Sequence, residues 1–415
     1  MNPKFDVAII GGGASGLTAA IQVKRKNPEL SVVILEKKEK VGKKLSAAGN
    51  GRCNLSNSSA DGFNSVIQFF GEVGIALRKD ESGRIYPYSE DGAQVTRVLE
   101  TNVLGLGVTI CLNTSVNRME VGPEGGFLLF VCENFDKGMK KDFQEKVIFA
   151  KKVLLATGGK SYASMGTTGD GFIMARKSGH SVTPLAPGLT GIEVLEKTDS
   201  LKGVRVKGTA TILHGEDVIS KEEGEMQFRN GSVSGICIMN LSNFIKPGRG
   251  SDGKLNFDGY KLSIDLTCDY DCTELINLLS QRKKLPGYKA ENLLETLVKG
   301  KIGREILRRA DVLPESPAEL LDNKKIKKIA ELLKSFCFHI SGLSGWNEAQ
   351  ITIGGVDMSE VNPKTMESRL ICGLYFSGEV LDYAGPCGGY NLNNAFLTGI
   401  KAGESMAIEE GAVKA

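Results

Sequence analysis

A glycine cluster near the N-terminus contains the residues best suited to bind a phosphate group. Gly11, Gly13 and Gly16 directly follow an apolar run and precede an alanine-rich stretch. In this spacing the first glycine permits a tight turn, the second lets the backbone approach a pyrophosphate, and the third lets a helix pack against a strand. The N–H groups of Ala14 and Ser15 would then face the phosphates at the positive end of that helix.

An acid at the end of the next apolar run completes this pattern. Residues 31–35 read as a second strand and end at Glu36, about 20 residues after Gly16. A carboxylate at this position can accept hydrogen bonds from ribose hydroxyls. Strand, glycine turn, helix, strand and acid therefore predict a dinucleotide-binding βαβ unit. The alternative is a glycine-rich turn that binds nothing.

Two later segments favour FAD over a nicotinamide cofactor. The first is 156–159, where a hydrophobic strand runs into two glycines, and the second is 374–382, a strand followed by Gly378 and Glu379. An extended FAD needs a second turn near its ribityl chain and ring, and Glu379 is placed to hydrogen-bond the ribityl or pyrophosphate region. A helix that begins near Asn391 would aim its positive end at the N1/O2 edge of the flavin. The alternative is an ordinary surface turn.

Composition limits the remaining possibilities. The chain has 415 residues, 41% hydrophobic and 24% charged, with a net charge of +3, so no global field indicates nucleic acid or a membrane. No apolar run approaches the roughly 18 residues of a membrane span, and no signal segment precedes the first strand, so we expect a cytoplasmic protein. Nine cysteines without Cys-x-x-Cys spacing and only three histidines predict no metal site and no disulfide-reductase chemistry.

The distribution of periodicities along the chain predicts an α/β fold with two further parts. Residues 1–190 and 345–415 have glycine-rich α/β character, including a helical period over 64–79. Alternating apolar and polar residues predict a β-barrel-like substrate domain over 191–272 and 336–344. The intervening residues 273–335 have helical period. We therefore expect a discontinuous Rossmann-type FAD-binding domain interrupted by a barrel that carries a helical insert.

Several motifs spread over nearly the whole chain are similar to those of one protein family. Besides the N-terminal glycines, they are the segments 49–54, 158–162, 168–171, 347–356, 363–368 and 378–382. Together they resemble the BaiN-like, aminoacetone-oxidase-like family of bacterial FAD-dependent oxidoreductases, and the resemblance implies the same domain layout. At Asn50 and Cys387 the chain departs from the family's frequent Gly and Thr, so neither side chain is assigned a role.

The motifs and the resemblance together give a set of expected cofactor-binding residues. They are Gly11, Gly13, Ala14, Ser15, Gly16, Glu36, Lys37, Gly42, Lys44, Ser46, Gly51, Arg52, Cys53, Asn54, Val116, Ala156, Thr157, Gly158, Gly159, Asp170, Gly378, Glu379, Asp382, Gly389, Tyr390, Asn391 and Leu392. The catalytic residues stay unassigned. Arg52, Cys53, Tyr162 and Tyr390 are the candidates, each weighed against an ordinary structural role, and for Cys53 a small packed residue is the favoured interpretation.

The resemblance leaves the reaction open among three enzyme classes. The first expectation is reduction of an unsaturated small molecule, such as an enone or a bile-acid-like compound, with electrons from NADH or NADPH. No second nicotinamide fold is visible over 190–345, so such a donor would bind transiently. The alternatives are an oxidase of a small amine such as aminoacetone and a reductase of uridine in ribosomal RNA. In the RNA case, lysines at 37–44 and 324–328 and arginines at 304–309 would contact phosphates.

A purely structural FAD protein is the non-enzymatic alternative. The oligomeric state is left open by the sequence.

Overall fold

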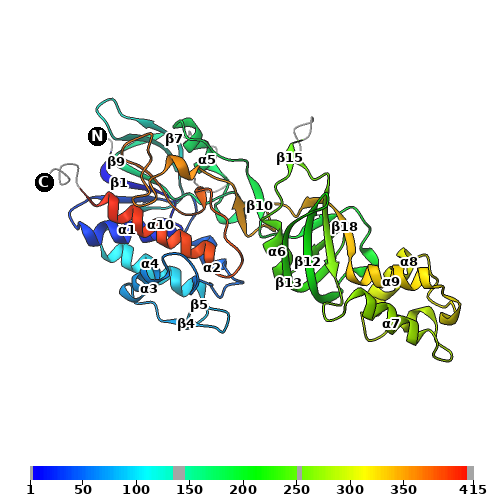
Figure 1. Cartoon of the computed structure of the whole chain (residues 1–415). Helices are drawn as coiled ribbons and strands as arrows, with labels where there is room; N and C mark the ends of the chain where they lie inside the picture. Colours follow the sequence, from blue (N-terminus) through cyan, green and yellow to red (C-terminus); the bar gives the residue numbers. More distant parts are fainter. Residues whose placement is uncertain (1–2, 134–144, 250–254, 409–415) are drawn as a thin grey trace, which may run out of the picture. The chain divides into compact units, whose positions relative to one another are not determined.

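The computed structural model describes residues 3–133, 145–249 and 255–408. The chain forms two compact units, one made of Met1–Pro187 with Gln350–Ala415 and the other of Gly188–Ala349 (Figure 1). The first unit is therefore discontinuous in sequence, and the second is inserted into it. This arrangement confirms the expected α/β fold, in which a Rossmann-type unit is interrupted by a barrel.

The first unit is built on a seven-stranded sheet. Its order is β6-β2-β1-β9-β8-β7, with β20 also paired to β9. β1 pairs in parallel with β2 and β9, and β7, β8 and β9 form an antiparallel meander. The elements of this unit are β1 (Lys4–Ile10), α1 (Ala14–Lys26), β2 (Val32–Leu35), α2 (Lys43–Ala47), β3 (Ser56–Asn57), α3 (Phe63–Glu72), β4 (Leu77–Lys79), β5 (Arg84–Pro87), α4 (Gly92–Gly105), β6 (Thr109–Cys111), β7 (Thr114–Val121), β8 (Phe127–Glu133), β9 (Lys146–Leu155), α5 (Asp170–Lys177), β10 (Ala186–Gly188), β19 (Ile351–Ile353), β20 (Leu374–Phe376) and α10 (Tyr390–Met406).

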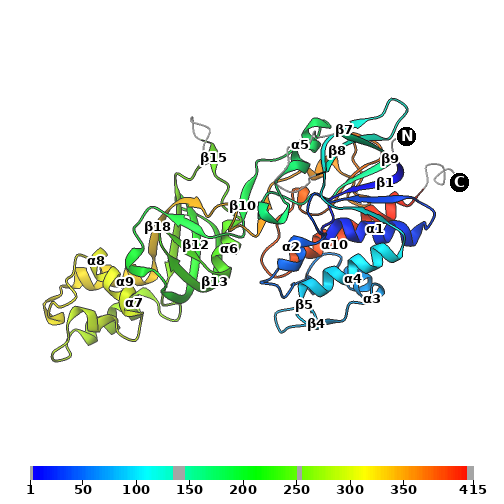
Figure 2. The same ribbon diagram turned by 180° about the vertical axis from the view of Figure 1, so that it is seen from behind.

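Continuous apolar runs explain why the central strands lie inside this unit. All four residues of β2 and the last four of β1 are buried, as expected for parallel strands that are covered on both faces. Helix α1 packs beside α10, and Figures 1 and 2 show the two helices side by side from opposite directions. A Cβ atom on Gly399 of α10 would lie 2.6 Å from the carbonyl oxygen of Ser15. The small side chain therefore lets the C-terminal helix approach the N-terminal one.

The second unit is a closed antiparallel barrel with helices inserted between two of its strands. The barrel order is β11-β14-β13-β12-β17-β18, and α7, α8 and α9 lie between β17 and β18 in the chain. Phe228, Phe336 and Phe338 are fully buried, and the last two rings lie 4.9 Å apart. The elements are β11 (Ile192–Val194), β12 (Arg205–His214), β13 (Asp217–Arg229), β14 (Ser232–Ser234), α6 (Ile236–Ser242), β15 (Gly248–Arg249), β16 (Leu255–Asn256), β17 (Tyr260–Asp265), α7 (Cys272–Arg282), α8 (Gly300–Arg309), α9 (Asn323–Lys334) and β18 (Phe336–Leu343).

Several basic residues of the helical insert have structural partners within the second unit. Arg309 is 16% exposed and donates to Glu305 and to the carbonyl of Cys337. Lys325 donates to the carbonyls of Ala310 and Asp311 at the end of α8. These two side chains therefore stabilise the second unit itself, whereas Arg304 and Arg308 on the same helix as Arg309 are each 71% exposed.

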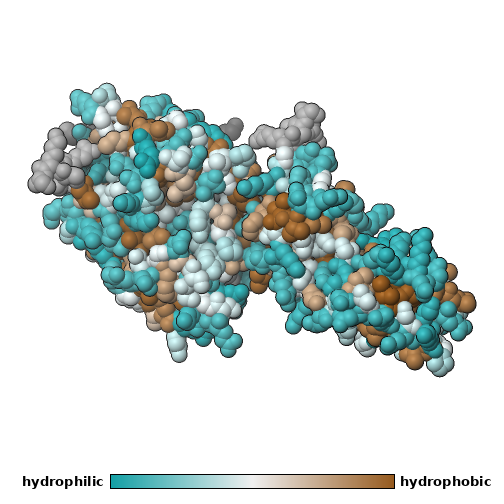
Figure 3. Space-filling model, in the orientation of Figure 1, coloured by the Kyte–Doolittle hydropathy of each residue, from teal (hydrophilic) through white to brown (hydrophobic). Residues whose placement is uncertain are grey.

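The surface carries scattered apolar side chains among hydrophilic ones on the face drawn in Figure 3. Leu320 and Leu195 are among the most exposed, at 75% and 71%. Singly exposed apolar side chains are normal in globular proteins, so these positions do not by themselves mark a binding surface. Within the described ranges, no helix has the length and apolarity required to span a bilayer.

Candidate functional site

The glycine turn between β1 and α1 presents open backbone. Helix α1 begins at Ala14 without a side-chain cap and without an acid in its first turn. No atom lies within 4 Å of the position that a Cβ on Gly13 would occupy, whereas a Cβ on Gly16 would lie 2.0 Å from the Gly11 carbonyl oxygen. Gly16 therefore permits the turn to pack on itself, and Gly13 leaves room for a ligand beside the first N–H groups of the helix.

The carboxylate of Glu36 is tied to this turn. Its Oε2 accepts the Gly12 N–H at 2.8 Å, and its Oε1 accepts the Lys38 N–H at 2.8 Å. A carboxylate oxygen can accept two hydrogen bonds, so each oxygen retains capacity for one more donor. The geometry is compatible with the expected contact to ribose hydroxyls.

A cavity of about 440 Å³ lies at the end of β2. Lys37 and Asp170 form an ion pair of 2.6 Å at this cavity. Burial raises the pKa of Asp170, but hydrogen bonds from Lys37 and Thr168 outweigh it and hold the pKa below its usual value. The cavity is lined by Lys37, Lys38, Ser115, Val116, Asn117, Arg118, Met119, Thr168, Asp170, Ile173, Met174 and Lys177. Three of the expected cofactor residues, Lys37, Val116 and Asp170, are thus brought together here.

The Lys37–Asp170 pair leads to a test of this cavity. We expect Asp170→Asn to weaken FAD binding about five-fold, because Lys37 is then no longer held in place at the cavity by an ion pair that contributes up to about 1 kcal/mol. FAD titration into the apoprotein, followed by flavin fluorescence, measures the effect. Glu39→Gln is the matched control, since Glu39 pairs with Lys43 at 2.9 Å and does not line the cavity. Equal affinities of the Asp170 variant and wild type would contradict the role of the pair.

The segment around Glu379 reaches the start of α1. The Ser15 hydroxyl donates to the Ser377 carbonyl at 3.5 Å, and a Cβ on Gly378 would lie 2.7 Å from Ser15 Oγ. Two sequence segments that are far apart in the chain therefore meet at the glycine turn. Gly378 has φ +74° and opens the short 3-10 helix Gly378–Val380, which carries Glu379.

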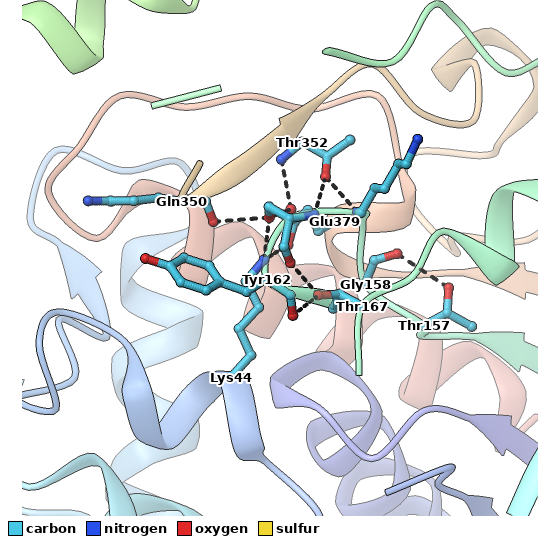
Figure 4. A network of polar contacts seen from close by, with 10 residues as sticks. Lys44, Thr157, Gly158, Tyr162, Thr167, Gln350, Thr352 and Glu379 are labelled. Atoms are coloured by element: carbon cyan, nitrogen blue, oxygen red, sulfur yellow. Dashed lines mark hydrogen bonds and ion pairs between the residues drawn. The ribbon is translucent and has the colours of Figure 1, made fainter. Parts of the chain in front are cut away.

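Glu379 belongs to a polar network drawn in Figure 4. Lys44 Nζ lies 2.7 Å from its Oε2, while the Ser161 hydroxyl at 3.1 Å and the Thr352 N–H at 2.8 Å donate to its Oε1. Lys44 also donates to Ser161 Oγ at 2.8 Å. Sequence reasoning placed Lys44 and Glu379 in the site but missed Ser161 and Thr352. Both residues belong to motifs on which the family resemblance is based, at 158–162 and 347–356. Their spacing in the sequence gave no indication that both would contact Glu379.

The start of α10 forms a third part of the site. Gly389 precedes the helix, which has no side-chain cap and no acid in its first turn. A Cβ on Gly389 would lie 2.3 Å from the Ser56 carbonyl oxygen and 2.7 Å from Asn54 Oδ1. Asn391 fixes the preceding loop by donating to the Gly385 carbonyl and accepting the Gly385 N–H, both at 2.9 Å.

Features at the starts of α1 and α10 fit a bound FAD. Asn54 Oδ1 beside α10 and Ser377 Oγ beside α1 are buried acceptors without a hydrogen-bond partner among the described residues. The space beside Gly13 and the uncapped N-termini of both helices suit an anionic group and a flavin edge that gains negative charge on reduction. The residues present therefore fit this cofactor at both of its ends.

The four candidate catalytic residues have different surroundings. Cys53 is fully buried, and burial raises the pKa of its thiol to about 12, which favours the packed interpretation. Arg52 is exposed, with its guanidinium 5.5 Å from the centre of the Tyr86 ring. Tyr162 and Tyr390 are half-buried, and neither hydroxyl has a hydrogen-bond partner in the described part of the chain. The tyrosines therefore remain the better candidates for proton donation.

Other expected cofactor residues occupy the edges of the site or have protein partners. Gly11 packs on the Ala156 carbonyl, a Cβ on Gly171 would meet the side chain of Thr157, and Gly42 donates its N–H to the Gly12 carbonyl at 2.8 Å. A Cβ on Gly51, like one on Gly13, would have no other atom within 4 Å. Leu392 packs against the hydrophobic core of the first unit. Two side chains face other groups: Ser46 bonds Thr96 at 2.8 Å, and Asp382 accepts from Thr183 at 2.9 Å.

Comparison with protein families identifies the chain. The family described as "HI0933-like protein Rossmann domain" matches residues 5–64 and 62–405. The chain belongs to this family. The match confirms the resemblance found in the motifs, and it extends over both described units. As an HI0933-like protein the chain is an FAD-dependent oxidoreductase.

Two curated relatives match this HI0933-like chain over nearly its full length. A 3-dehydro-bile acid delta(4,6)-reductase of Clostridium scindens is 31% identical, with 97% of this chain and 98% of the relative covered. A ribosomal RNA dihydrouridine synthase of Escherichia coli is 26% identical, with 95% and 96% covered. Both relatives are therefore similar to this chain in both of its units.

A solved structure is also similar in fold. The 3-ketosteroid-delta4-(5alpha)-dehydrogenase of Rhodococcus jostii RHA1 covers 98% of both chains, with 15% identity and a TM-score of 0.48.

Proposed function

We propose that this flavoprotein reduces a carbon–carbon double bond conjugated to a ketone in a hydrophobic, bile-acid-like substrate, with electrons from NADH or NADPH. The observation that carries the proposal is the 31% identity to the Clostridium scindens reductase over 97% of this chain. The match covers the FAD-binding unit and the inserted barrel alike. We keep the division of the second unit into a substrate-binding barrel (191–272 and 336–344) and a helical insert (273–335) as part of this proposal.

The residues of the site suit such a reduction. Bound FAD supplies hydride transfer. The positive end of α10 stabilises negative charge at the adjoining edge of the site. Reduction of an enone also needs a proton donor for the carbon next to the ketone, and the free hydroxyls of Tyr162 and Tyr390 are the candidates for it. We propose that the cofactor-binding residues expected from the sequence hold the FAD in this enzyme.

Reduction of uridine in ribosomal RNA is the second candidate, favoured by the Escherichia coli relative. It belongs to the same chemical class, because the uracil double bond is also conjugated to a carbonyl. Two observations weigh against it. Arg309 and Lys325 have partners within the helical insert, and strand β13 carries the exposed acids Glu223 and Glu225. An RNA-binding surface would instead present an excess of free cations.

An anaerobic spectroscopic assay tests the proposal. The holoenzyme is mixed with NADH or NADPH in a stopped-flow instrument, and loss of the visible flavin band reports reduction. A 3-oxo bile acid with a conjugated double bond is then added, and we expect the band to return while the product gains two hydrogen atoms by mass spectrometry. The flavin band staying oxidised with both donors would contradict the proposed electron source.

Two further arms separate the alternatives. Ribosomal RNA fragments offered to the reduced enzyme would reoxidise it only if uridine is the substrate. Oxygen uptake with aminoacetone would indicate an amine oxidase. Reoxidation by RNA, or oxygen uptake driven by aminoacetone as the electron donor, without reoxidation by any enone, would overturn the proposal in favour of the corresponding alternative.

A further inference from the structure

Arg84 presents an unpaired guanidinium beside the turn that leads into α10. Strands β3 and β5 place it there, because Arg84 lies directly opposite Asn57 in their antiparallel pairing. Its backbone N–H donates to Asp80 at 2.9 Å, but its guanidinium has no hydrogen bond and no ion pair with any residue that the structure describes. The side chain is half-buried. A charged group that is partly removed from water needs a partner, so this guanidinium is a candidate for binding a ligand.

Three groups converge on the position that a side chain at 388 would occupy. A Cβ on Gly388 would lie 3.6 Å from Tyr390 Cε2, 3.7 Å from Asn57 Nδ2 and 3.8 Å from Arg84 Nε. Gly388 has φ +121°, a backbone conformation that favours glycine. Asn57 is 5% exposed and fixes the turn by donating to the Gly388 carbonyl at 3.0 Å. The turn therefore holds two N–H-bearing side chains and a tyrosine ring around one point.

The next glycine faces groups of the opposite kind. A Cβ on Gly389 would lie 2.3 Å from the Ser56 carbonyl oxygen and 2.7 Å from Asn54 Oδ1, a buried acceptor with no partner among the described residues. A flavin ring carries an N–H that suits such acceptors, and the start of α10 already offers its own N–H groups and positive end to the flavin edge. The donors beside Gly388 are thus available to an oxygen atom of a second ligand.

We propose that Arg84 binds the ketone oxygen of the enone substrate and stabilises the negative charge that forms on it. This inference deepens the proposed function and rests on it. A hydride added to the carbon β to the ketone moves the electron pair of the double bond onto the ketone oxygen. A proton then enters at the carbon next to the ketone, and the ketone is restored. The guanidinium donates to the oxygen while its charge develops, which lowers the barrier to hydride transfer.

The place of Tyr390 suits the proton-transfer half of this reaction. The carbon that takes up the proton is bonded to the ketone carbon, so its proton donor must lie close to the group that binds the ketone oxygen. The ring of Tyr390 and the guanidinium of Arg84 both lie within 4 Å of the position beside Gly388. This placement favours Tyr390 over Tyr162 as the proton donor.

Binding of a phenolate to the oxidised holoenzyme tests the Arg84 site without turnover. Deprotonated para-chlorophenol resembles the enolate, because it combines a planar conjugated system with a negative oxygen. A phenolate stacked on oxidised flavin gives a long-wavelength charge-transfer band, whose growth on titration measures affinity. We expect Arg84→Met to weaken phenolate binding about ten-fold and to raise the pKa of the bound phenol, since a hydrogen bond from a cation stabilises the charged form. Arg84→Lys, which keeps the charge, should lose less affinity.

Reoxidation of the reduced holoenzyme by the enone, followed by stopped flow, measures the catalytic step. Arg84→Met should slow reoxidation about 100-fold, as for removal of one oxyanion-stabilising donor, while FAD affinity and flavin reduction stay within about two-fold of wild type. Arg78→Met is the matched control, because Arg78 lies on the neighbouring strand β4, has a side chain that is 48% exposed, and pairs with Glu90. It should change neither phenolate binding nor reoxidation. Thermal unfolding reports whether each variant folds, and Arg84→Gln replaces Arg84→Met if that variant does not.

The outcomes separate this inference from the proposed function. Phenolate binding that is equal in wild type and Arg84→Met, or absent from wild type, would overturn the inference. An equal loss of FAD affinity would also overturn it, because Arg84 would then hold the flavin. If enones reoxidise both proteins equally fast, the proposed reaction stands and the role of Arg84 is refuted. If no enone reoxidises wild type, the proposed reaction fails, and the phenolate titration alone decides whether Arg84 binds an oxyanion.

Discussion

Gly13→Ala should give a folded apoprotein that binds FAD about 100-fold more weakly. Gly13 has extended backbone, with φ −85° and ψ −168°, which alanine adopts without strain. No atom of the protein lies within 4 Å of the added Cβ, so the methyl group occupies the space through which the cofactor would approach. An extra methyl in a tightly packed contact costs up to about 3 kcal/mol, which corresponds to the stated loss. FAD titration of the apoprotein measures it.

Two other glycine substitutions are the controls for this result. Gly71 lies in helix α3, is exposed, and has open space where a Cβ would be added. Gly71→Ala should therefore leave FAD affinity unchanged and stabilise the helix by about 0.5–1 kcal/mol. Gly16→Ala would place a methyl 2.0 Å from the Gly11 carbonyl, so it should reduce both stability and FAD binding. Normal affinity in Gly13→Ala would show that the cofactor does not approach this turn closely.

Local sequence patterns were sufficient to predict those helices, strands and turns that are determined by residues close together in the chain. The predicted strand, turn, helix and strand of the first βαβ unit correspond to β1, α1 and β2, because apolar runs and a glycine turn determine them locally. The alternation after residue 190 likewise predicted the barrel. The helix start expected near Asn391 agrees with α10, which begins at Tyr390.

Predictions that depended on distant partners were less complete. The helical period over 64–79 extends too far, because α3 ends at Glu72 and residues 77–79 form β4, which pairs with β5. The apolar residue Leu77 fits either period, and only the partner strand decides between them. The partners of Glu379 come from positions 44, 161 and 352, and no spacing in a single sequence indicates that such positions meet.

Arg309→Met should destabilise the second unit by about 3 kcal/mol. Arg309 donates to Glu305 at 3.0 Å and to the Cys337 carbonyl at 2.7 Å, and its guanidinium lies 4.2 Å from the centre of the Phe336 ring. Glu305 is only 7% exposed, so removing Arg309 leaves a buried carboxylate with one exposed partner, Arg308. Removing one partner of a buried ion pair typically costs about 3–5 kcal/mol. Because Arg308 still pairs with Glu305, we expect a loss of stability at the lower end of this range.

The single tryptophan of the chain, Trp346, lies in the second unit, so its fluorescence during urea unfolding reports on this unit. Arg304→Met is the matched control in the same helix, because Arg304 is 71% exposed and 4.0 Å from Glu291, and it should cost at most about 0.5 kcal/mol. Equal effects of the two substitutions would contradict a structural role for Arg309.

The pH dependence of unfolding provides a second measure of the same pair. Burial raises the pKa of Glu305, but Arg308 and Arg309 outweigh this effect and hold the pKa below its usual range. A carboxyl whose pKa is lowered on folding stabilises the native state above its unfolded pKa of about 4.3, and this stabilisation is lost as the pH falls through the lowered value. In Arg309→Met the pKa of Glu305 should rise, so the second unit should lose less stability between neutral and acid pH than wild type. If Arg309 stabilised the unit only by packing on Phe336, the pH dependence would not change, because that contact does not depend on the charge of Glu305. An unchanged pH profile in Arg309→Met would therefore contradict the role of Arg309 in lowering the pKa of Glu305.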